Sequence, residues 1–139
     1  MKVIHKSYKF KIAPDNEQKE LLAKHFGACR FVFNRYLNIR KETYLEEKKS
    51  LNYYDNANDL TVLKKDEQFV WLKEINSQSL QSSLRNLDTA YNKFFRKQTK
   101  FPRFKSKVDK QSFTIPQSVS IEDGKLQIPK FKKGIEINI

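Results

Sequence analysis

Residues 77–97 read SQSLQSSLRNLDTAYNKFFRK, and this segment carries the most regular pattern in the chain of 139 residues. Its apolar side chains recur at steps of 4, 3, 4 and 3, at Leu80, Leu84, Leu87, Tyr91 and Phe94. This spacing places them on one face of an α-helix, so we expect an amphipathic helix over 77–97 with Ser77 as its N-cap. A coiled coil is the competing interpretation, but two heptads are too short to favour it.

Two further helices are expected before this one. Apolar side chains recur at steps of three, four and eight, at Leu22, Phe26, Cys29, Phe33, Tyr36 and Tyr44. They predict a long helix to about residue 48, with Asp15 as its N-cap or first-turn acid. Gly27 inside it marks a kink or a close helix contact. Residues 50–58 are typical of a loop, and a short helix is expected over 58–68, followed by a hydrophobic plug of Trp71 and Leu72.

Strand patterns occupy both ends of the chain. Residues 2–12 alternate and predict a strand with one buried face, formed by Ile4, Tyr8, Phe10 and Ile12. After Pro102 the strand pattern returns at Phe113 and Ile115, and again over 135–139. The pair Asp123-Gly124 predicts a two-residue hairpin in which Glu122 faces Lys125.

The order of these elements predicts an α+β fold. One N-terminal strand leaves its backbone groups unpaired, and only the C-terminal strands can pair with it. We therefore expect a small β-barrel or sheet from residues 1–13 and 108–139, with a helical block, residues 14–107, inserted into it. Because the alternation still runs at Ile139, we expect the last strand to be incomplete and the chain to stop inside a β-domain.

Charge is concentrated in residues 93–110, which read KFFRKQTKFPRFKSKVDK. The chain has a formal net charge of +12, and this basic segment holds eight cations with Asp109 as its one acid. A run of one sign attracts a polyanion such as nucleic acid, whereas a solvated surface normally carries both signs. The alternative is a flexible charged linker between the helical block and the barrel. Stacking on unpaired bases and core packing are both open for the interleaved Phe94, Phe95, Phe101 and Phe104.

Composition excludes several classes of protein. No apolar run approaches the roughly 18 residues that a membrane-spanning helix needs, and the N-terminus has no signal-peptide apolar core, so we expect a cytoplasmic protein that binds no membrane. A single cysteine, Cys29, excludes an intrachain disulfide and a cysteine-based zinc site, and its place on an apolar stripe indicates a buried, inert thiol. His5 and His25 are too few and too far apart to suggest a metal centre, so no cofactor is expected.

Four segments, taken in order, resemble a known family: residues 9–37, 71–97, 100–107 and 111–131. Together they are similar to the N-terminal part of the OrfB/TnpB proteins of insertion sequences, which are RNA-guided DNA endonucleases similar to type V CRISPR effectors. The most specific strings are GACRFVFN (27–34), LRNLDTAYNKFF (84–95) and FPRFKSK (101–107). The resemblance implies an oligonucleotide-binding-like wedge barrel, with a helical recognition domain inserted after its first strand.

The same resemblance implies that cleavage belongs to another part of such proteins. In the family, a RuvC-like nuclease whose three carboxylates hold divalent metal follows the wedge domain, together with a zinc ribbon. This sequence contains no paired-carboxylate motif and no Cys-x-x-Cys. We therefore expect a non-catalytic fragment without a metal of its own, whose partners are guide RNA and double-stranded DNA that carries a target-adjacent motif.

The start of the 77–97 helix is the expected site of DNA recognition. A glutamine can bond adenine bidentately, and a helix N-terminus favours phosphate, which fits Ser77, Gln78 and Gln81. The resemblance implies that this turn reads the motif beside the target, with Gln81 as the reading residue. The alternative is a helix cap with an exposed polar face. Further candidate contacts to the DNA motif are Tyr53, which the alternative interpretation packs on the helices, and Thr114 and Gln117 in the returning strands.

Contacts to the nucleic-acid backbone are expected from exposed cations. The basic segment supplies point charges and forked donors that match phosphate. Arginines of the long helix either extend this surface or are ordinary solvated charge: Arg30, Arg35 and Arg40. The expected backbone contacts are Lys9, Lys11, Arg96, Lys97, Lys100, Arg103, Lys105 and Lys107.

Two other functions fit the same residues. One is a stand-alone DNA-binding regulator derived from a transposase, which binds duplex DNA without a guide, although no short turn before a separate recognition helix is evident. The other is a protein-interaction module that dimerises through the Leu80–Phe94 stripe. Sedimentation would then show a concentration-dependent dimer that salt barely affects.

Overall fold

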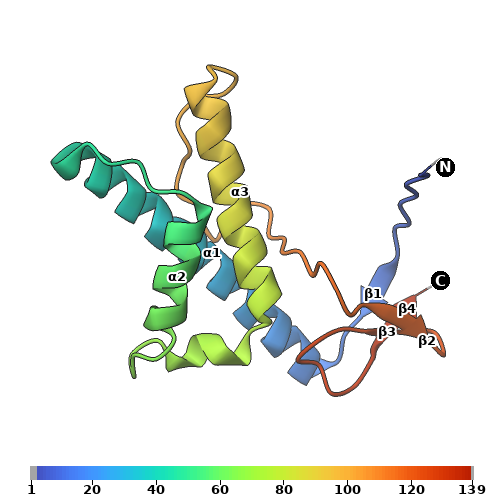
Figure 1. Cartoon of the computed structure of the whole chain (residues 1–139). Coiled ribbons are helices and arrows are strands. Elements are labelled where there is room, and N and C mark those ends of the chain that lie inside the picture. The colour runs from blue at the N-terminus through green and yellow to red at the C-terminus, as the bar shows by residue number, and fades with distance from the viewer. Residues whose placement is uncertain (1–2, 139) are drawn as a thin grey trace.

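The structure, a computed structural model of the chain, describes residues 3–138 and consists of a helical unit and a small sheet (Figure 1). The helices α1, α2 and α3 pack together, and the sheet lies beside the N-terminal end of α1. The expected order of strand, helices and strands is confirmed. The elements are β1 (Lys11–Ala13), α1 (Asn16–Glu47), α2 (Tyr53–Leu63), the 3-10 helix η1 (Val70–Glu74), α3 (Ser77–Phe95), β2 (Ser120–Glu122), β3 (Lys125–Gln127) and β4 (Ile135–Asn138).

Helix α1 begins where the sequence predicts. Asp15 is its N-cap and accepts a hydrogen bond from the amide of Gln18 (2.9 Å), while the Gln18 side chain accepts one from the amide of Asp15 (2.9 Å). The Nε2 atom of Gln18 also donates to the carbonyl oxygens of Lys133 and Gly134, which ties the start of the helix to the chain entering β4. A Cβ at Gly27 would meet no atom nearer than 3.8 Å, so the interpretation of Gly27 as a close helix contact is wrong.

The segment between the long helices differs from the prediction. Helix α2 covers Tyr53–Leu63, so the residues expected to form a loop already contain its first turns. The cause is a capping box, in which Asn52 accepts from the amide of Asp55 and Asp55 accepts from the amide of Asn52. Short polar side chains favour loops and helix N-caps alike, and the sequence pattern does not separate the two. Of the expected hydrophobic plug, Leu72 is fully buried but Trp71 is 42% exposed.

The apolar stripe of α3 forms the centre of the larger hydrophobic core. Leu80, Leu84 and Leu87 are completely buried, and α3 packs against α1 and α2. The N-cap is Asn76 instead of Ser77, because the Asn76 side chain accepts a hydrogen bond from a backbone amide of the first turn. Since Leu80, Leu84, Leu87 and Tyr91 are buried within one chain, these residues of the stripe are not available for a coiled coil or for the dimerisation considered above.

The sheet confirms that the two ends of the chain pair with each other. Its strand order is β1-β4-β3-β2, and every neighbouring pair is antiparallel. The β2–β3 hairpin places Glu122 opposite Lys125, as expected. Asp123 and Gly124 adopt φ values of 52° and 72°, and positive φ at both central residues is the requirement of a type I′ turn.

Other expectations about the strands are wrong. Strand β1 covers only Lys11–Ala13, and Ile4, Tyr8 and Phe10 are exposed because β4 pairs only with residues 11–13. Phe113 and Ile115 lie in no strand; they are half-buried, and each packs against one of the two hydrophobic cores. The sheet is open, so no closed barrel is present within residues 3–138. The expected incomplete strand end at residue 139 lies outside the described residues.

A buried histidine lies where the helical unit meets the sheet. His25 of α1 is fully buried; its Nδ1 donates to the carbonyl oxygen of Leu21 (2.9 Å), and its Nε2 accepts from the amide of Asn76 (3.3 Å). Phe113 and Phe131 flank the ring, with centroids 5.2 and 5.5 Å away. Burial is the main cause that lowers the pKa of His25 below its usual value, so the imidazole is neutral at pH 7.

Candidate nucleic-acid interface

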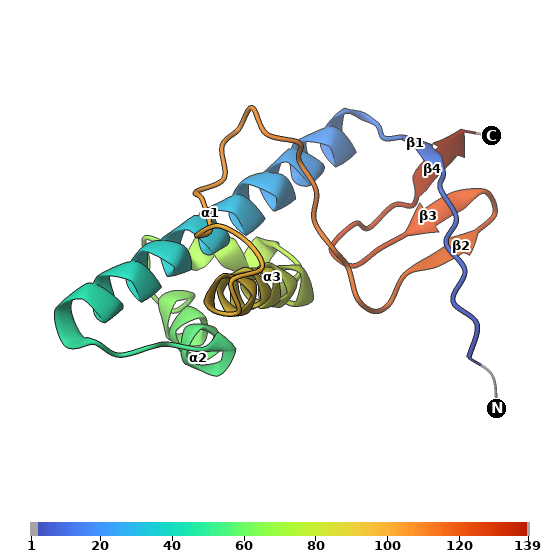
Figure 2. The same ribbon diagram turned by 90° about the horizontal axis from the view of Figure 1, so that it is seen from above.

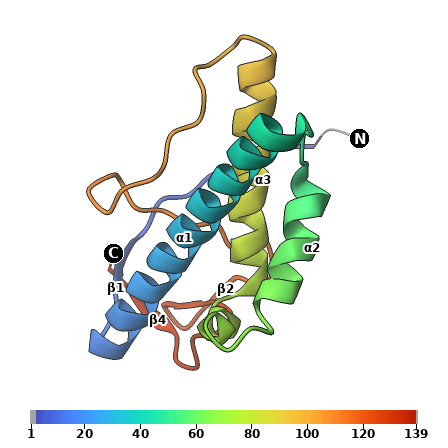
Figure 3. The same ribbon diagram turned by 90° about the vertical axis from the view of Figure 1, so that its left-hand side faces the viewer.

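The basic segment, residues 93–110, turns back along α1 instead of projecting from α3 (Figure 2, Figure 3). It leaves α3 at the C-cap Arg96, and Lys97 then adopts a φ of 61° where the chain reverses. Phe101 packs edge-on against Tyr91 and Phe94, with ring centroids 5.4 and 5.2 Å apart. The aromatic cluster anchors the chain between α3 and β2, residues 96–119, which we call the returning chain, to the last turns of α3.

Asn34 on α1 clamps the same segment further along. Its Nδ2 donates to the carbonyl oxygen of Lys105 (2.9 Å), and its Oδ1 accepts from the amide of Lys105 (2.7 Å). The Lys105 side chain then extends over Phe33, with Nζ 4.5 Å from the ring centroid. Both the backbone and the side chain of Lys105 are therefore held on α1, which argues against a flexible linker.

A second set of hydrogen bonds shapes the turn that follows. The amide of Ser106 donates to Asp109 (2.9 Å), so the one acid of the segment stabilises a turn. The Gln111 side chain donates to the carbonyl oxygen of Lys107 (2.7 Å) and accepts from Arg30 of α1 (3.2 Å). Within residues 3–138, no ion pair engages a cation of the basic segment.

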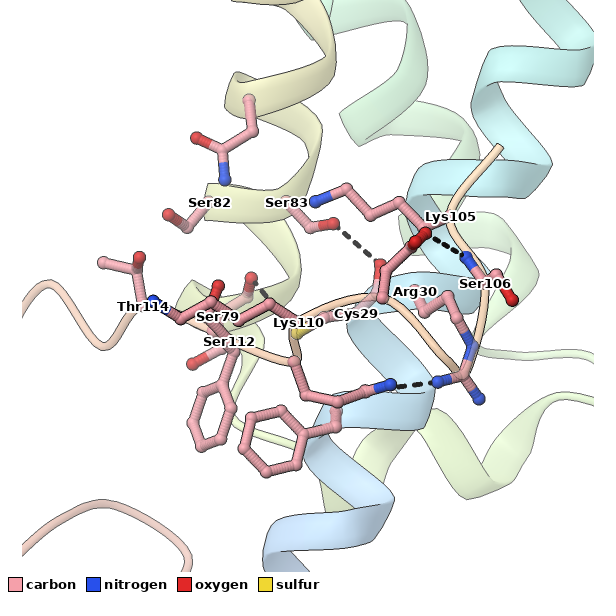
Figure 4. A pocket seen from close by; sticks show the side chains of 15 residues that line it. Cys29, Arg30, Ser79, Ser82, Ser83, Lys105, Ser106, Lys110, Ser112 and Thr114 are labelled. Atoms are coloured by element: carbon pink, nitrogen blue, oxygen red, sulfur yellow. Dashed lines mark hydrogen bonds between the residues drawn. The ribbon is translucent and has the colours of Figure 1, made fainter. Parts of the chain in front are cut away.

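The returning chain, α1 and the first half of α3 enclose a small polar cavity of about 70 Å³, which we call the serine cradle (Figure 4). Ser83 donates to the carbonyl oxygen of Cys29 across it (2.8 Å), which holds α1 and α3 together. Hydroxyl groups beside cations are the surroundings that a phosphate group favours. Its polar lining includes Cys29 and Arg30 from α1, Ser79, Ser82, Ser83 and Asn86 from α3, and Lys105, Ser106, Asp109, Lys110, Gln111, Ser112 and Thr114 from the returning chain.

The serine cradle is not anticipated by the sequence analysis. The sequence feature that could have revealed the cavity is a second face of α3. On this face, beside the apolar stripe, small polar residues recur at positions 79, 82, 83 and 86. Such a face is typical of a solvated surface, and only the path of the returning chain covers it. Cys29 in this cavity is buried as expected, and burial raises its pKa to about 11, so the thiol remains protonated.

Most of the expected DNA-reading residues lie near one another at the start of α3. Ser77 and Gln81 are exposed on its first two turns. The Nε2 atom of Gln78 donates to Oε1 of Gln117 in the returning chain (3.2 Å). Thr114 lines the serine cradle between these two segments (Figure 4). Segments far apart in the sequence thus contribute to one exposed polar surface.

The ring of Tyr53 is packed against neighbouring side chains instead of being exposed. It is buried at the first turn of α2, and the guanidinium carbon of Arg85 lies 4.2 Å from its ring centroid. Tyr54 meets the same ring edge-on at 5.3 Å. These contacts match the alternative in which Tyr53 packs on the helices, and Arg85 follows Gln81 by one helical turn.

The expected backbone cations are all exposed, but they form no single stripe. The sheet and the C-terminal end of α3 lie at opposite ends of the molecule (Figure 1). A nucleic acid that contacts all of these cations must follow the returning chain from the tip of α3 to the sheet. Lys9 and Lys11 lie at the sheet, Arg96, Lys97 and Lys100 near the end of α3, and Arg103, Lys105 and Lys107 on the chain that returns along α1.

The arginines of α1 serve the fold. Arg40 is only 4% exposed and donates to Asn56 (2.7 Å) and to Asp88 (2.9 Å). These bonds of buried Arg40 join α1, α2 and α3, so neither interpretation of Arg40, as part of a basic surface or as solvated charge, is correct. Arg35 is half-buried, with its guanidinium carbon 5.1 Å from the ring centroid of Phe69.

Two other kinds of site were searched for among residues 3–138. No group of three or more side chains there is arranged to hold a metal ion. No helix in the same range has the length and apolar character needed to cross a bilayer.

Several known proteins are similar to this chain. Residues 1–49 match the helix-turn-helix domain of IS605-type OrfB proteins. A protein of Escherichia coli K12 named "Putative RNA-guided DNA endonuclease InsQ" is 38% identical over 126 residues, which cover 89% of this chain and 31% of that protein. A "Putative RNA-guided DNA endonuclease" of Streptomyces pristinaespiralis is 32% identical over 139 residues, which cover 99% of this chain and 35% of that protein.

A further relative aligns over most of its own length. "Virulence protein VsdF" of Salmonella dublin is 36% identical over 105 residues, which cover 69% of this chain and 88% of that protein. The chain spans about a third of the length of the two endonuclease relatives. Despite the helix-turn-helix name, the described part of residues 1–49 contains β1 and one uninterrupted helix. The sequence similarity is nevertheless specific, and the chain belongs to the OrfB/TnpB family of insertion-sequence proteins.

Proposed function

We propose that this chain is a nucleic-acid-binding region of a TnpB-like RNA-guided DNA endonuclease. It binds guide RNA along the basic segment and reads the target-adjacent DNA motif at the start of α3, and it performs no cleavage step itself. The observation that carries the proposal is the docking of the basic segment on α1 through Asn34 and on α3 through Phe101. The two relatives named as RNA-guided DNA endonucleases support the choice of nucleic acid.

The docked position of the basic segment affects the free energy of binding. A disordered basic tail must be ordered when it binds, and that ordering reduces its affinity. A segment that is already held in place presents its cations at fixed positions before the ligand arrives. Each phosphate that these cations neutralise releases condensed counterions, so binding should weaken steeply with salt.

We also infer the domain division. The helical unit corresponds to the recognition domain, residues 14–107, and the sheet with its flanking chain to the wedge domain, residues 1–13 and 108–139. Two separate hydrophobic cores, one within the helices and one under the sheet, support this division. The open edges of the sheet are β1 and β2, which is where further pairing would close a barrel.

Salt-dependent RNA binding tests the role of the basic segment. A triple variant, Arg103→Ala, Lys105→Ala and Lys107→Ala, removes three charges from the returning chain. Fluorescence anisotropy with a labelled structured RNA should show a weaker complex and a flatter dependence of log K on log salt, by up to about 2–3 slope units for three lost phosphate contacts. The control is the triple variant Lys49→Ala, Lys65→Ala and Lys73→Ala, which removes equal charge from exposed positions outside the basic segment.

The control variant distinguishes binding at a specific surface from attraction by the net charge of the whole chain. If the two triple variants weaken RNA binding equally, the net charge alone drives association and the assigned surface is wrong. If neither variant changes the salt slope, the basic segment does not contact RNA phosphates.

Motif reading is tested separately with duplex DNA. Gln81→Ala should reduce the preference among duplexes that differ in one motif base, by about 1–3 kcal/mol for a lost bidentate contact, while the affinity for unrelated duplex changes little. Gln68→Ala, an exposed glutamine outside α3, is the control. Equal loss on every duplex would show that Gln81 does not read sequence.

A second candidate function is a stand-alone DNA-binding protein. The observation that favours it is the match to "Virulence protein VsdF", of which 88% is covered by this region alone. Such a protein would bind duplex DNA in the absence of any guide RNA. Titration of duplex DNA with and without added RNA separates this function from the first.

A further inference from the structure

An apolar groove lies at the end of the helical unit away from the serine cradle. Its volume is about 880 Å³, and it is bounded by the last turns of α1, the chain that follows α1 and the last turns of α3. Its apolar walls are formed by Tyr44, Leu45, Tyr91, Phe94, Phe95 and Phe101. The volume lies within the range of sites that hold small molecules or single groups of a larger ligand.

The walls of the groove are unusually exposed for side chains of this kind. Leu45 is 61% exposed, Phe95 57% and Tyr44 47%. Leu45 and Tyr44 lie on α1, and Phe95 ends α3, so apolar groups face the groove from two sides. Apolar surface gathered in one concave place, and rimmed by polar groups, marks an interaction site.

The charges around the groove indicate the chemistry of its ligand. Among the residues that the structure describes, Asp88 is the one carboxylate that lines the groove, and Arg40 already engages it at 2.9 Å. Cations of the basic segment alternate along the chain with the aromatic residues of the wall. In the sequence these cations are Lys93, Arg96, Lys97 and Lys100, which are neighbours of the wall residues Phe94, Phe95 and Phe101. The groove itself is lined by Lys41 and Arg40 of α1.

An aromatic groove with Lys41 in its lining and further cations next to its wall residues in the sequence matches a single strand of nucleic acid. Bases present flat apolar faces for stacking, and the phosphates that join them need cations at the edge. A second copy of this chain would instead bring two sets of these cations together. The hydroxyl of Tyr91, which lines the groove, is buried without a hydrogen-bond partner among the described residues, so the floor also holds one unused polar group.

We infer that this groove binds unpaired nucleobases of a single strand, with Phe95 and Tyr44 as stacking platforms and the neighbouring cations on the flanking phosphates. The inference deepens the proposed function and rests on it, because it names the unpaired part of the nucleic acid as the ligand of this end of the basic segment. It also gives separate roles to two parts of that segment. The part near α3 binds bases together with their flanking phosphates, and the part clamped on α1 binds the backbone alone.

Binding of base-containing and abasic strands tests the inference. The probes are labelled single strands of about 12 nucleotides, one of uridines, one of thymidines and one of abasic sugar-phosphates with the same charge. The full chain should bind the two base-containing strands more tightly than the abasic strand. Tighter binding of uridine than thymidine strands would identify RNA as the source of the bases, and the reverse would identify DNA.

Alanine substitutions in the walls of the groove test whether the bases bind there. Phe95→Ala should weaken binding of the uridine strand roughly 5- to 150-fold, the range that corresponds to loss of stacking on one base. Its salt slope should not change, because no charge is lost. Leu45→Ala on the opposite wall should act in the same direction, and Tyr54→Ala, an exposed aromatic on α2, is the matched control. These side chains are all largely exposed, so the variants should fold normally.

Three results would overturn the inference. Equal binding of abasic and base-containing strands would show that only phosphate is recognised. Equal effects of Phe95→Ala and Tyr54→Ala would place the base contacts elsewhere. A dimer in sedimentation that Phe95→Ala abolishes would show that the groove is an interface between copies. Failure of the proposed function is distinguishable, because the triple variant of Arg103, Lys105 and Lys107 would then keep the wild-type salt slope.

Discussion

Replacing Asn34 with alanine should release the basic segment from α1. The Asn34 side chain makes two hydrogen bonds with the backbone of Lys105, at 2.9 and 2.7 Å. Each such bond contributes about 0.5–1.5 kcal/mol net, and exposed bonds lie toward the lower end. Their joint loss shifts the docking equilibrium by about 1–2 kcal/mol, which is roughly 5- to 30-fold. The contacts of Phe101 remain, so the segment detaches locally while the helical core stays folded.

Two measurements follow this perturbation. Amide hydrogen exchange, read by NMR, should show protection of the Lys105 amide falling by about 5- to 30-fold. If the docked segment is the binding-competent state, the dissociation constant for RNA rises by no more than the same factor. The melting temperature should hardly change. Asn38→Ala is the control, because Asn38 lies one turn further along α1 and is exposed.

Different outcomes would refute different steps. Unchanged exchange at Lys105 in Asn34→Ala would show that the two hydrogen bonds do not hold the segment. Faster exchange with unaltered RNA affinity would show that docking of the segment plays no part in binding. An equal loss of affinity in Asn38→Ala would point to a general effect of α1.

Three further predictions concern stability. Because burial lowers the pKa of His25, the free energy of unfolding should fall as the pH drops below about 6.5, by at most about 1.4 kcal/mol per pH unit. Denaturation at pH 7.5 and at pH 5.5 measures this difference in the free energy of unfolding. The variant His25→Gln should remove the pH dependence. Asp88→Ala leaves buried Arg40 without its charge partner and should cost about 3 kcal/mol in urea denaturation; a loss below 1 kcal/mol would contradict this. Gly134→Ala should cost about 1–3 kcal/mol, because its Cβ would lie 2.8 Å from the Cβ of Lys125; an unchanged melting temperature would show that the sheet adapts.

Local patterns in the sequence predict much of the secondary structure. Periodicity alone gives α1 and α3 nearly to their ends, and the Asp123-Gly124 pair gives the hairpin with its register. These features depend on residues within a few positions of one another, so the sequence states them directly. Residues 2–12 show where prediction from alternation fails. The alternating pattern does not reveal that β4 pairs only with residues 11–13.

The candidate site is predicted in part. The sequence identifies the basic segment and the polar start of α3 by charge and residue type. It does not reveal the serine cradle, because that cavity exists only where the returning chain lies across α3. Arg40 is misassigned for a related reason: its partners come from α2 and α3, and no spacing within α1 indicates that its guanidinium is buried.

The sequence by itself determined which faces of the helices are apolar, where the main turns fall and where positive charge accumulates. The tertiary structure alone decided that the basic segment is docked, through bonds between Asn34 and Lys105, residues 71 positions apart. It also decided that aromatic side chains from α1, α3 and the returning chain share one groove. The physical reason is that periodicity and capping act over a few residues, whereas docking depends on which distant groups satisfy each other's hydrogen bonds once the core has formed.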